Sequence, residues 1–215
     1  MSRARLLLAD DHMLLLDGYR KLLEPEFELV GAVENGRELL DIAPKLKPDV
    51  ILMDISMPLL NGIDATRRLR KLVPKSKILI VTMHADADYV AEAFRAGASG
   101  YLLKRSAASE LVSAIHEVLE GKRYLTPLIT GQALDWLRKS EGREGGGGGA
   151  ASVLSPRQRE VLQLVAEGRT AKEIATLLRI SVKTVEFHKS RIMRELGMRS
   201  VAEITRYALR QGMIG

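Results

Sequence analysis

The sequence predicts an α/β fold with a parallel sheet, followed by a small all-α part. Short apolar segments alternate five times with segments whose apolar residues recur at helical spacing, a pattern typical of a parallel sheet covered by helices on both faces. Residues 153–215 contain helical patterns only. A glycine-rich stretch, SEGREGGGGGAAS, separates the two parts and indicates that they are distinct domains.

The sheet is expected to have five strands. Four apolar residues in a row at 50–53 predict the central strand, because such a run indicates burial on both faces. The alternation favours the flavodoxin-like strand order 2-1-3-4-5. The expected strands are 5–9, 28–33, 50–53, 77–81 and 100–103, and the helices that follow them are 12–23, 36–46, 61–72, 87–96 and 107–119.

The middle of the chain is predicted to be a connection. Residues 126–139 carry an apolar stripe that predicts one further helix, and residues 140–152 include five consecutive glycines, which hold structure poorly. A flexible linker of this length spans roughly 20 Å, so the flanking parts can dock or separate. We therefore expect three divisions: residues 1–125, a linker helix and flexible linker at 126–152, and residues 153–215.

The C-terminal part is predicted to contain four short helices. Ser155 and Pro156 supply an N-cap and a proline at the first helical position, and Thr170 and Ser181 are typical N-caps. Two short helices joined by a tight turn, the second of them basic, make a helix-turn-helix pattern. The expected helices are 157–167, 171–179, 181–196 and 201–211.

The positive charge of the chain is concentrated in this part. Residues 1–140 hold 20 Lys and Arg against 19 Asp and Glu, residues 141–150 contribute −1, and residues 151–215 hold 12 against 6. The formal net charge of +6 therefore belongs to the last segment. A small basic module indicates a polyanionic partner, either nucleic acid or a membrane surface.

Several chemically active side chains are predicted to meet at one edge of the sheet. Asp10 and Asp11 end the first strand, Asp54 the third, Thr82 the fourth and Lys104 the fifth. Three converging carboxylates repel each other and call for a hard divalent cation, for which Mg²⁺ fits best. With a hydroxyl and an ammonium beside them, these groups suit phosphoryl transfer to a carboxylate, giving an aspartyl phosphate.

Residues 1 to about 125 resemble a response-regulator receiver domain, through ADD at 9–11, MDISMP at 53–58, Thr82 and GYLLK at 100–104. The resemblance implies that Asp54 is the phospho-acceptor, phosphorylated by a sensor histidine kinase. It implies that Mg²⁺ is held by Asp10, Asp11, Asp54 and the backbone carbonyl of Ser56. Thr82 and Lys104 would hold the phosphoryl oxygens, and Tyr101 would move inward with Thr82. The domain would not be an enzyme beyond phosphorylation and dephosphorylation of its own aspartate.

Residues 154–208 resemble the LuxR-type helix-turn-helix of the NarL/FixJ subfamily, most specifically over SVKTVEFHKSRIMRELG at 181–197. The resemblance implies binding to double-stranded DNA as a homodimer when phosphorylated or DNA-bound. Helical spacing places Val185 and Ile192 on the inner side of the third helix and Phe187 on the outer side. The expected DNA contacts are Lys183, Thr184, Glu186, Phe187, Lys189, Ser190, Arg191 and Arg194.

The favoured function is therefore a phosphorylation-gated transcription factor without a membrane partner. The absence of cysteine fits a reducing compartment, and no segment approaches the roughly 20 apolar residues of a spanning helix, so we expect a cytoplasmic protein. Two other readings stay open at this point. An aspartate-nucleophile phosphohydrolase would share the acidic site but lacks a second acid two residues after Asp54, where Ser56 stands. A membrane- or RNA-associated adaptor would also explain the basic module.

Overall fold

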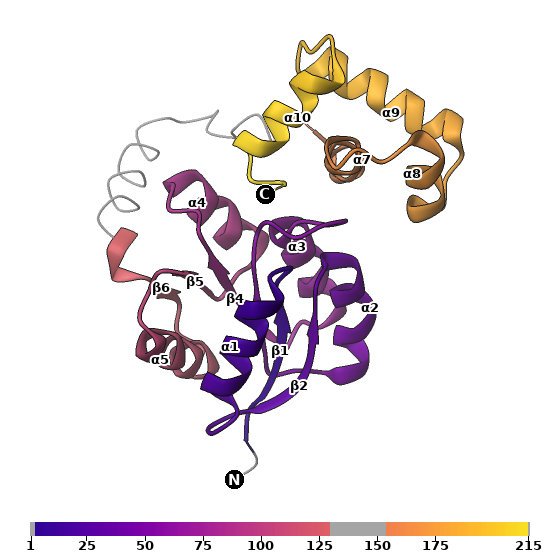
Figure 1. Ribbon diagram of the computed structural model, residues 1–215. Helices are drawn as coiled ribbons and strands as arrows, with labels where there is room; N and C mark the ends of the chain where they lie inside the picture. The colour runs from indigo at the N-terminus through magenta and orange to yellow at the C-terminus, as the bar shows by residue number, and fades with distance from the viewer. Residues whose placement is uncertain (1–2, 130–153, 215) are drawn as a thin grey trace.

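The computed structural model describes residues 3–129 and 154–214 (Figure 1). The glycine-rich linker and most of the helix expected at 126–139 lie outside the described residues. Figure 1 shows an α/β part below and a group of four helices, α7 to α10, above it. Among the described residues, no helix is long and apolar enough to cross a membrane.

The sheet is parallel, with the strand order β2-β1-β3-β4-β5-β6. Its strands are β1 (Arg5–Ala9), β2 (Glu28–Val33), β3 (Val50–Met53), β4 (Lys77–Thr82), β5 (Gly100–Leu103) and β6 (Tyr124–Leu125). The order expected for the first five strands is confirmed, but the expectation of five strands in total is wrong. The sixth pairs Tyr124 with Gly100 and Leu125 with Tyr101, and two residues are too few to show a strand period in the sequence.

Helices cover both faces of this sheet: α1 (Met13–Leu23), α2 (Gly36–Leu46), α3 (Gly62–Leu72), α4 (Ala87–Ala96) and α5 (Ala108–Leu119). Successive residues of a strand point to opposite faces, so Leu7 and Ile51 belong to one apolar cluster and Leu6 and Leu52 to another. The residues of both clusters are buried, so the sheet is a rigid support for the residues at its carboxyl edge.

The C-terminal helices are α7 (Pro156–Ala166), α8 (Ala171–Leu178), α9 (Val182–Glu195) and α10 (Val201–Arg210). The caps expected from the sequence form: Ser155 with Gln158, and Thr170 with Glu173, make reciprocal capping boxes. These helices enclose a third apolar cluster, which includes Leu162, Ile174, Val185, Ile192 and Ile204. The C-terminal part therefore has a core of its own.

Candidate functional site

The predicted acidic cluster forms at the carboxyl ends of β1 and β3. The ammonium nitrogen of Lys104 lies 2.7 Å from Asp10 Oδ2 and 2.8 Å from Asp54 Oδ2, and all three side chains are buried. The other oxygen of Asp54 accepts a hydrogen bond from the backbone N–H of Ile55 at 2.6 Å. Burial by itself would lower the pKa of Lys104, but its hydrogen bonds to the two carboxylates outweigh burial and raise that pKa.

Asp11 and His12 extend this cluster toward solvent. Ligand atoms of Asp10, Asp11, His12 and Asp54 all lie within 4.8 Å of one another. The three carboxylates outweigh the single ammonium, so a divalent cation with oxygen ligands would lower the electrostatic cost of the cluster. His12, whose Nδ1 is 2.9 Å from Asp11 Oδ1, was not among the residues predicted from the sequence, although it directly follows the two acids.

Thr82 and Tyr101 lie beneath the same edge of the sheet, and both are fully buried. The Tyr101 hydroxyl donates a hydrogen bond of 2.8 Å to the backbone carbonyl of His84, in the loop between β4 and α4. Burial raises the pKa of Tyr101 above its ordinary value, so this hydroxyl remains a donor. The residue predicted as the aromatic switch is therefore tied to the loop that follows Thr82.

Ser56 and His84 connect the two loops beside Asp54. Ser56 Oγ lies 3.0 Å from His84 Nε2. Burial lowers the pKa of His84, and the neighbouring Asp54 carboxylate opposes that shift. His84 was not predicted as a site residue, because nothing in its sequence context distinguishes it from any other loop histidine.

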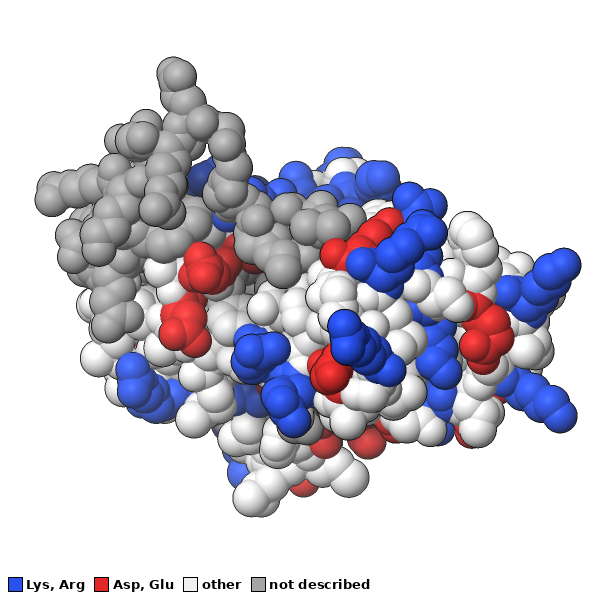
Figure 2. Space-filling view, turned by 90° about the horizontal axis from the view of Figure 1, so that it is seen from above, with Lys and Arg blue, Asp and Glu red and all other residues white. Residues whose placement is uncertain are grey.

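The outer face of α9 is exposed as predicted. Phe187 is 60% exposed, whereas Val185 and Ile192 on the inner side are buried in the helical core. Thr184 and Lys189 are half-buried, and the other predicted contacts, Lys183, Glu186, Ser190, Arg191 and Arg194, are exposed. An exposed apolar ring among polar side chains suits contact with a thymine methyl group. Figure 2, which views the molecule from above, shows Lys and Arg side chains at several places on the surface on that side.

Known proteins match both parts of the chain. Residues 6–116 match the response regulator receiver domain, and residues 152–208 match the bacterial regulatory proteins of the luxR family. The chain is 36% identical to the transcriptional regulatory protein MctR of Rhizobium johnstonii, covering 99% of this chain and 96% of that one. It is 35% identical to the oxygen regulatory protein NreC of Staphylococcus carnosus, covering 98% and 99%.

This chain belongs to the LuxR family of two-component response regulators. Among solved structures, RcsB of Salmonella typhimurium has a TM-score of 0.64 at 29% identity and covers 96% of this chain and 97% of its own. An RcsB–DNA complex has a TM-score of 0.59 at 29% identity, covering 96% and 98%. The N-terminal part of this response regulator is thus a receiver domain and the C-terminal part a LuxR-type DNA-binding domain.

The two domains are docked through α7 of the DNA-binding domain and the segment of the receiver that follows Asp54. Gln163 is fully buried, accepts from the backbone N–H of Asn61 at 2.9 Å and donates to the carbonyl of Met57 at 2.9 Å. Glu167 accepts from the backbone N–H of Leu59 at 2.9 Å. These bonds fix the loop after Asp54 against α7.

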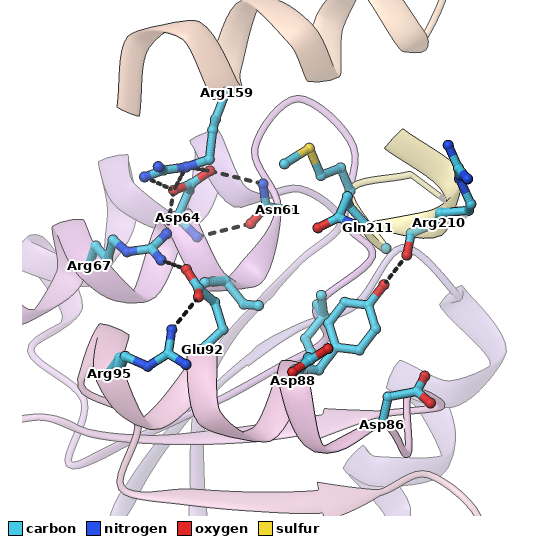
Figure 3. Close-up of a pocket in the computed structure, with 15 residues that line it drawn as sticks. Asn61, Asp64, Arg67, Asp86, Asp88, Glu92, Arg95, Arg159, Arg210 and Gln211 are labelled. Atoms are coloured by element: carbon cyan, nitrogen blue, oxygen red, sulfur yellow. Dashed lines mark hydrogen bonds and ion pairs between the residues drawn. The ribbon is translucent and has the colours of Figure 1, made fainter. Parts of the chain in front are cut away.

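Two ion-pair groups flank this loop. Asp64, at the start of α3, is paired with Arg159 of α7 at 2.9 Å and with Arg67 at 2.7 Å, and both Asp64 and Arg159 are buried (Figure 3). Glu160, also buried, accepts hydrogen bonds from Arg37 and Arg68 of the receiver. None of these residues was predicted as functional, because a charged residue on a helix is ordinarily a solvent-facing one.

Docking leaves the outer face of α9 open. The interface uses α7, the end of α8 and the end of α10, whereas the outer face of α9 remains exposed. Val201 and Leu209, which are eight residues apart on one side of α10, are also exposed. In the docked chain, the outer face of α9 and these two apolar side chains of α10 are therefore both exposed.

Proposed function

We propose that this response regulator is phosphorylated on Asp54 by a sensor histidine kinase, with Mg²⁺, and regulates transcription through sequence-specific binding of double-stranded DNA. The observation that supports this best is the Lys104 ammonium held between Asp10 and Asp54, with Asp11 beside them. The proposal divides the chain into a receiver at 1–125, a connection at 126–152 and a DNA-binding domain at 153–215. A genome-binding regulator of this kind would act in the cytoplasm.

In the proposed reaction, a carboxylate oxygen of Asp54 attacks the phosphorus of a phosphohistidine on the kinase. The P–O bond forms as the P–N bond breaks, and the imidazole leaves with its electron pair and takes up a proton. Lys104 exchanges its contact with Asp54 for a phosphoryl oxygen, and Thr82 donates its hydroxyl to another. Asp10, Asp11, Asp54 and the carbonyl of Ser56 would hold Mg²⁺, which neutralises charge on the phosphoryl oxygens when bound.

Exposed apolar side chains beside the site suit the kinase partner. Met13 and Leu14 at the start of α1 are 65% and 85% exposed, and Met83, directly after Thr82, is 68% exposed. Apolar side chains that gather around a polar site indicate a protein-binding surface. We propose that the kinase segment carrying the phosphohistidine packs against these three residues.

The metal requirement can be tested at Asp11. We expect Asp11→Ala to weaken Mg²⁺ binding about tenfold or more, since loss of even a supporting group at a metal site costs that much. Asp11 is exposed, so the variant should keep its fold. Isothermal titration calorimetry with MgCl₂ measures the affinity, with Asp17→Ala on the exposed side of α1 as the matched control. An unchanged affinity in Asp11→Ala would remove this residue from the metal site.

For DNA binding, we propose that α9 enters the major groove and that two chains pair through Val201 and Leu209 of α10. A dimer with two-fold symmetry can bind the two half-sites of a palindromic operator in the same way. Exposed apolar side chains on α10 suit self-association of two chains. Because docking leaves both surfaces exposed, we propose that phosphorylation acts on how two chains pair rather than by uncovering α9.

We expect different residues of α9 to control the affinity for DNA and the choice of base sequence. Phe187→Ala should change the preferred bases, at roughly 1–3 kcal/mol for the position it reads. Lys189→Ala should weaken binding to all sequences alike and lower the salt slope by about one, because a phosphate contact carries no sequence information. A binding-site selection with both variants measures this. If both keep the wild-type preferred sequence and differ in affinity alone, α9 is not the reading element.

A further inference from the structure

His12 presents a ring nitrogen to the acidic cluster. Its Nδ1 lies 2.9 Å from Asp11 Oδ1 and 3.1 Å from Asp10 Oδ1. Its backbone N–H also donates a hydrogen bond of 3.0 Å to Asp10 Oδ1. The other oxygen of Asp10 lies 2.7 Å from the Lys104 ammonium. His12 and Lys104 therefore contact different oxygens of the same carboxylate, and the Oδ1 side belongs to His12 and Asp11.

The local structure leaves the ring of His12 available to a ligand. His12 is the N-cap residue of α1, where a polar side chain ordinarily accepts a hydrogen bond from the first turn of the helix. The side chain of His12 makes no such bond. It is 62% exposed, so an ion arriving from solvent can reach it. The ring is thus held beside the acids without being used by the helix.

The spacing of the donor atoms suits a single bound ion. One ligand atom from each of four side chains lies within 4.8 Å of the other three: Asp10, Asp11, His12 and Asp54. In an octahedral shell with bonds of about 2.1 Å, neighbouring ligands are about 3.0 Å apart and opposite ligands about 4.2 Å apart. The two distances from His12 Nδ1 match neighbouring ligands. The nitrogen therefore lies where a ligand beside the two aspartate oxygens would lie.

Hydrogen bonding accounts for only part of this arrangement. The contact of Nδ1 with Asp10 has the geometry of a hydrogen bond, but Asp11 Oδ1 is closer, and a single N–H cannot point at both oxygens. Asp10 and Asp54 are also buried, at 2% and 4% exposed, with one ammonium between them. A cation bound by the nitrogen and the oxygens together would offset the charge that remains.

The type of donor atom decides which ions benefit from His12. Carboxylate and carbonyl oxygens suit Mg²⁺, which keeps several of its waters and gains little from a nitrogen ligand. An imidazole nitrogen suits divalent transition ions, among which affinity rises from Mn²⁺ to Ni²⁺ for a given set of nitrogen and oxygen ligands. A cluster of aspartates with one histidine is therefore a mixed donor set that favours a transition ion.

We propose that His12 is a further ligand of the metal site and strengthens its binding of divalent transition ions, but not of Mg²⁺. The inference rests on the proposed metal site and adds a residue to it. An ion held by His12 would compete with Mg²⁺ for Asp11 and Asp54. The ion bound beside Asp54 would then depend on the relative concentrations of Mg²⁺ and the transition ion.

The test compares Ni²⁺ and Mg²⁺ binding to the full chain by isothermal titration calorimetry. In His12→Asn, an amide N–H can still bond to the neighbouring carboxylates and asparagine is a good N-cap residue, but its nitrogen has no lone pair for a metal. We expect the Kd for Ni²⁺ to rise about tenfold or more and the Kd for Mg²⁺ to change less than about twofold. His116→Asn is the matched control, because His116 is an exposed histidine 2.6 Å from Glu26, outside the cluster.

Loss of Ni²⁺ affinity in His12→Asn alone, with Mg²⁺ affinity kept, supports the proposal. Unchanged Ni²⁺ affinity in His12→Asn overturns it. An equal loss for both ions also overturns it, because His12 would then only position the acids. Pulsed electron paramagnetic resonance of Mn²⁺ bound to wild type tests the same claim without a variant, and a spectrum without coupling to a nitrogen would contradict it. Wild type that binds neither Mg²⁺ nor Ni²⁺ would instead refute the proposed metal site itself.

Discussion

Replacing Asp54 with asparagine is expected to abolish phosphorylation of the full chain. The amide keeps the size of the carboxylate but has no nucleophilic oxygen for phosphoryl transfer. Asp54 ends the central strand β3 and lies 2.8 Å from Lys104, and we assign the neighbouring Asp10 to the metal rather than to the phosphoryl group. Intact-protein mass spectrometry after incubation with acetyl phosphate and Mg²⁺ should show one added phosphoryl group in wild type and none in the variant.

The matched control for this experiment is Asp41→Asn, which alters an exposed acid on α2 and should leave labelling unchanged. Undiminished labelling of Asp54→Asn would show that the phosphoryl group goes elsewhere. Peptide mapping would then have to locate the acceptor. The roles assigned to Asp54, Lys104 and Thr82 in phosphoryl transfer would all be wrong.

Replacing Arg159 with alanine is expected to open the two domains. Breaking a buried ion pair by removing one partner costs about 3–5 kcal/mol. Asp64 keeps Arg67 in the variant, so we expect the lower end of this range, about 3 kcal/mol, or roughly a hundredfold shift toward the undocked chain. The effect should appear as a change in domain separation rather than as unfolding, because the helical domain has its own core.

The opening can be measured by the distance between two spin labels, one on each domain. The sequence has no cysteine, so Glu120→Cys and Arg199→Cys, both at exposed positions, give specific labelling. Arg191→Ala is the control, because its ion pair with Glu195 lies within α9 and is exposed. A distance distribution in Arg159→Ala that matches the control would mean that the Asp64–Arg159 pair does not hold the domains together.

The sequence predicts most of the helices and strands, and it predicts which acidic residues lie together at the edge of the sheet. Strand β3 is recognisable because its residues are all apolar, and the helix that follows it begins at a clear cap, where Asn61 accepts from the backbone N–H of Asp64. Asp10, Asp54 and Lys104 meet because parallel strands end at one edge, so their convergence follows from strand order alone. Phe187 is exposed as its helical position predicts.

The docking of the domains could not be predicted in the same way. Asp64 and Arg159 are 95 residues apart in the sequence, and each occurs on a helix where a charge ordinarily faces solvent. Gln163 is fully buried. Nothing in the sequence around a single glutamine in an amphipathic helix indicates that its side chain bonds to another domain. The positions of His12 and His84 likewise depend on how separate loops meet. Such contacts depend on how segments far apart in the sequence pack together. A single sequence contains no periodic pattern or residue spacing that would predict them.

We propose above all that phosphorylation of Asp54 controls DNA binding. Footprinting of the full chain on genomic DNA, with and without acetyl phosphate and Mg²⁺, tests it most directly when wild type and Asp54→Asn are compared. We expect the phosphodonor to lower the protein concentration needed to protect specific sites in wild type and to leave the protection pattern of Asp54→Asn unchanged. Identical wild-type footprints with and without the donor, at a protein concentration where Asp54 is shown to be phosphorylated, would contradict it.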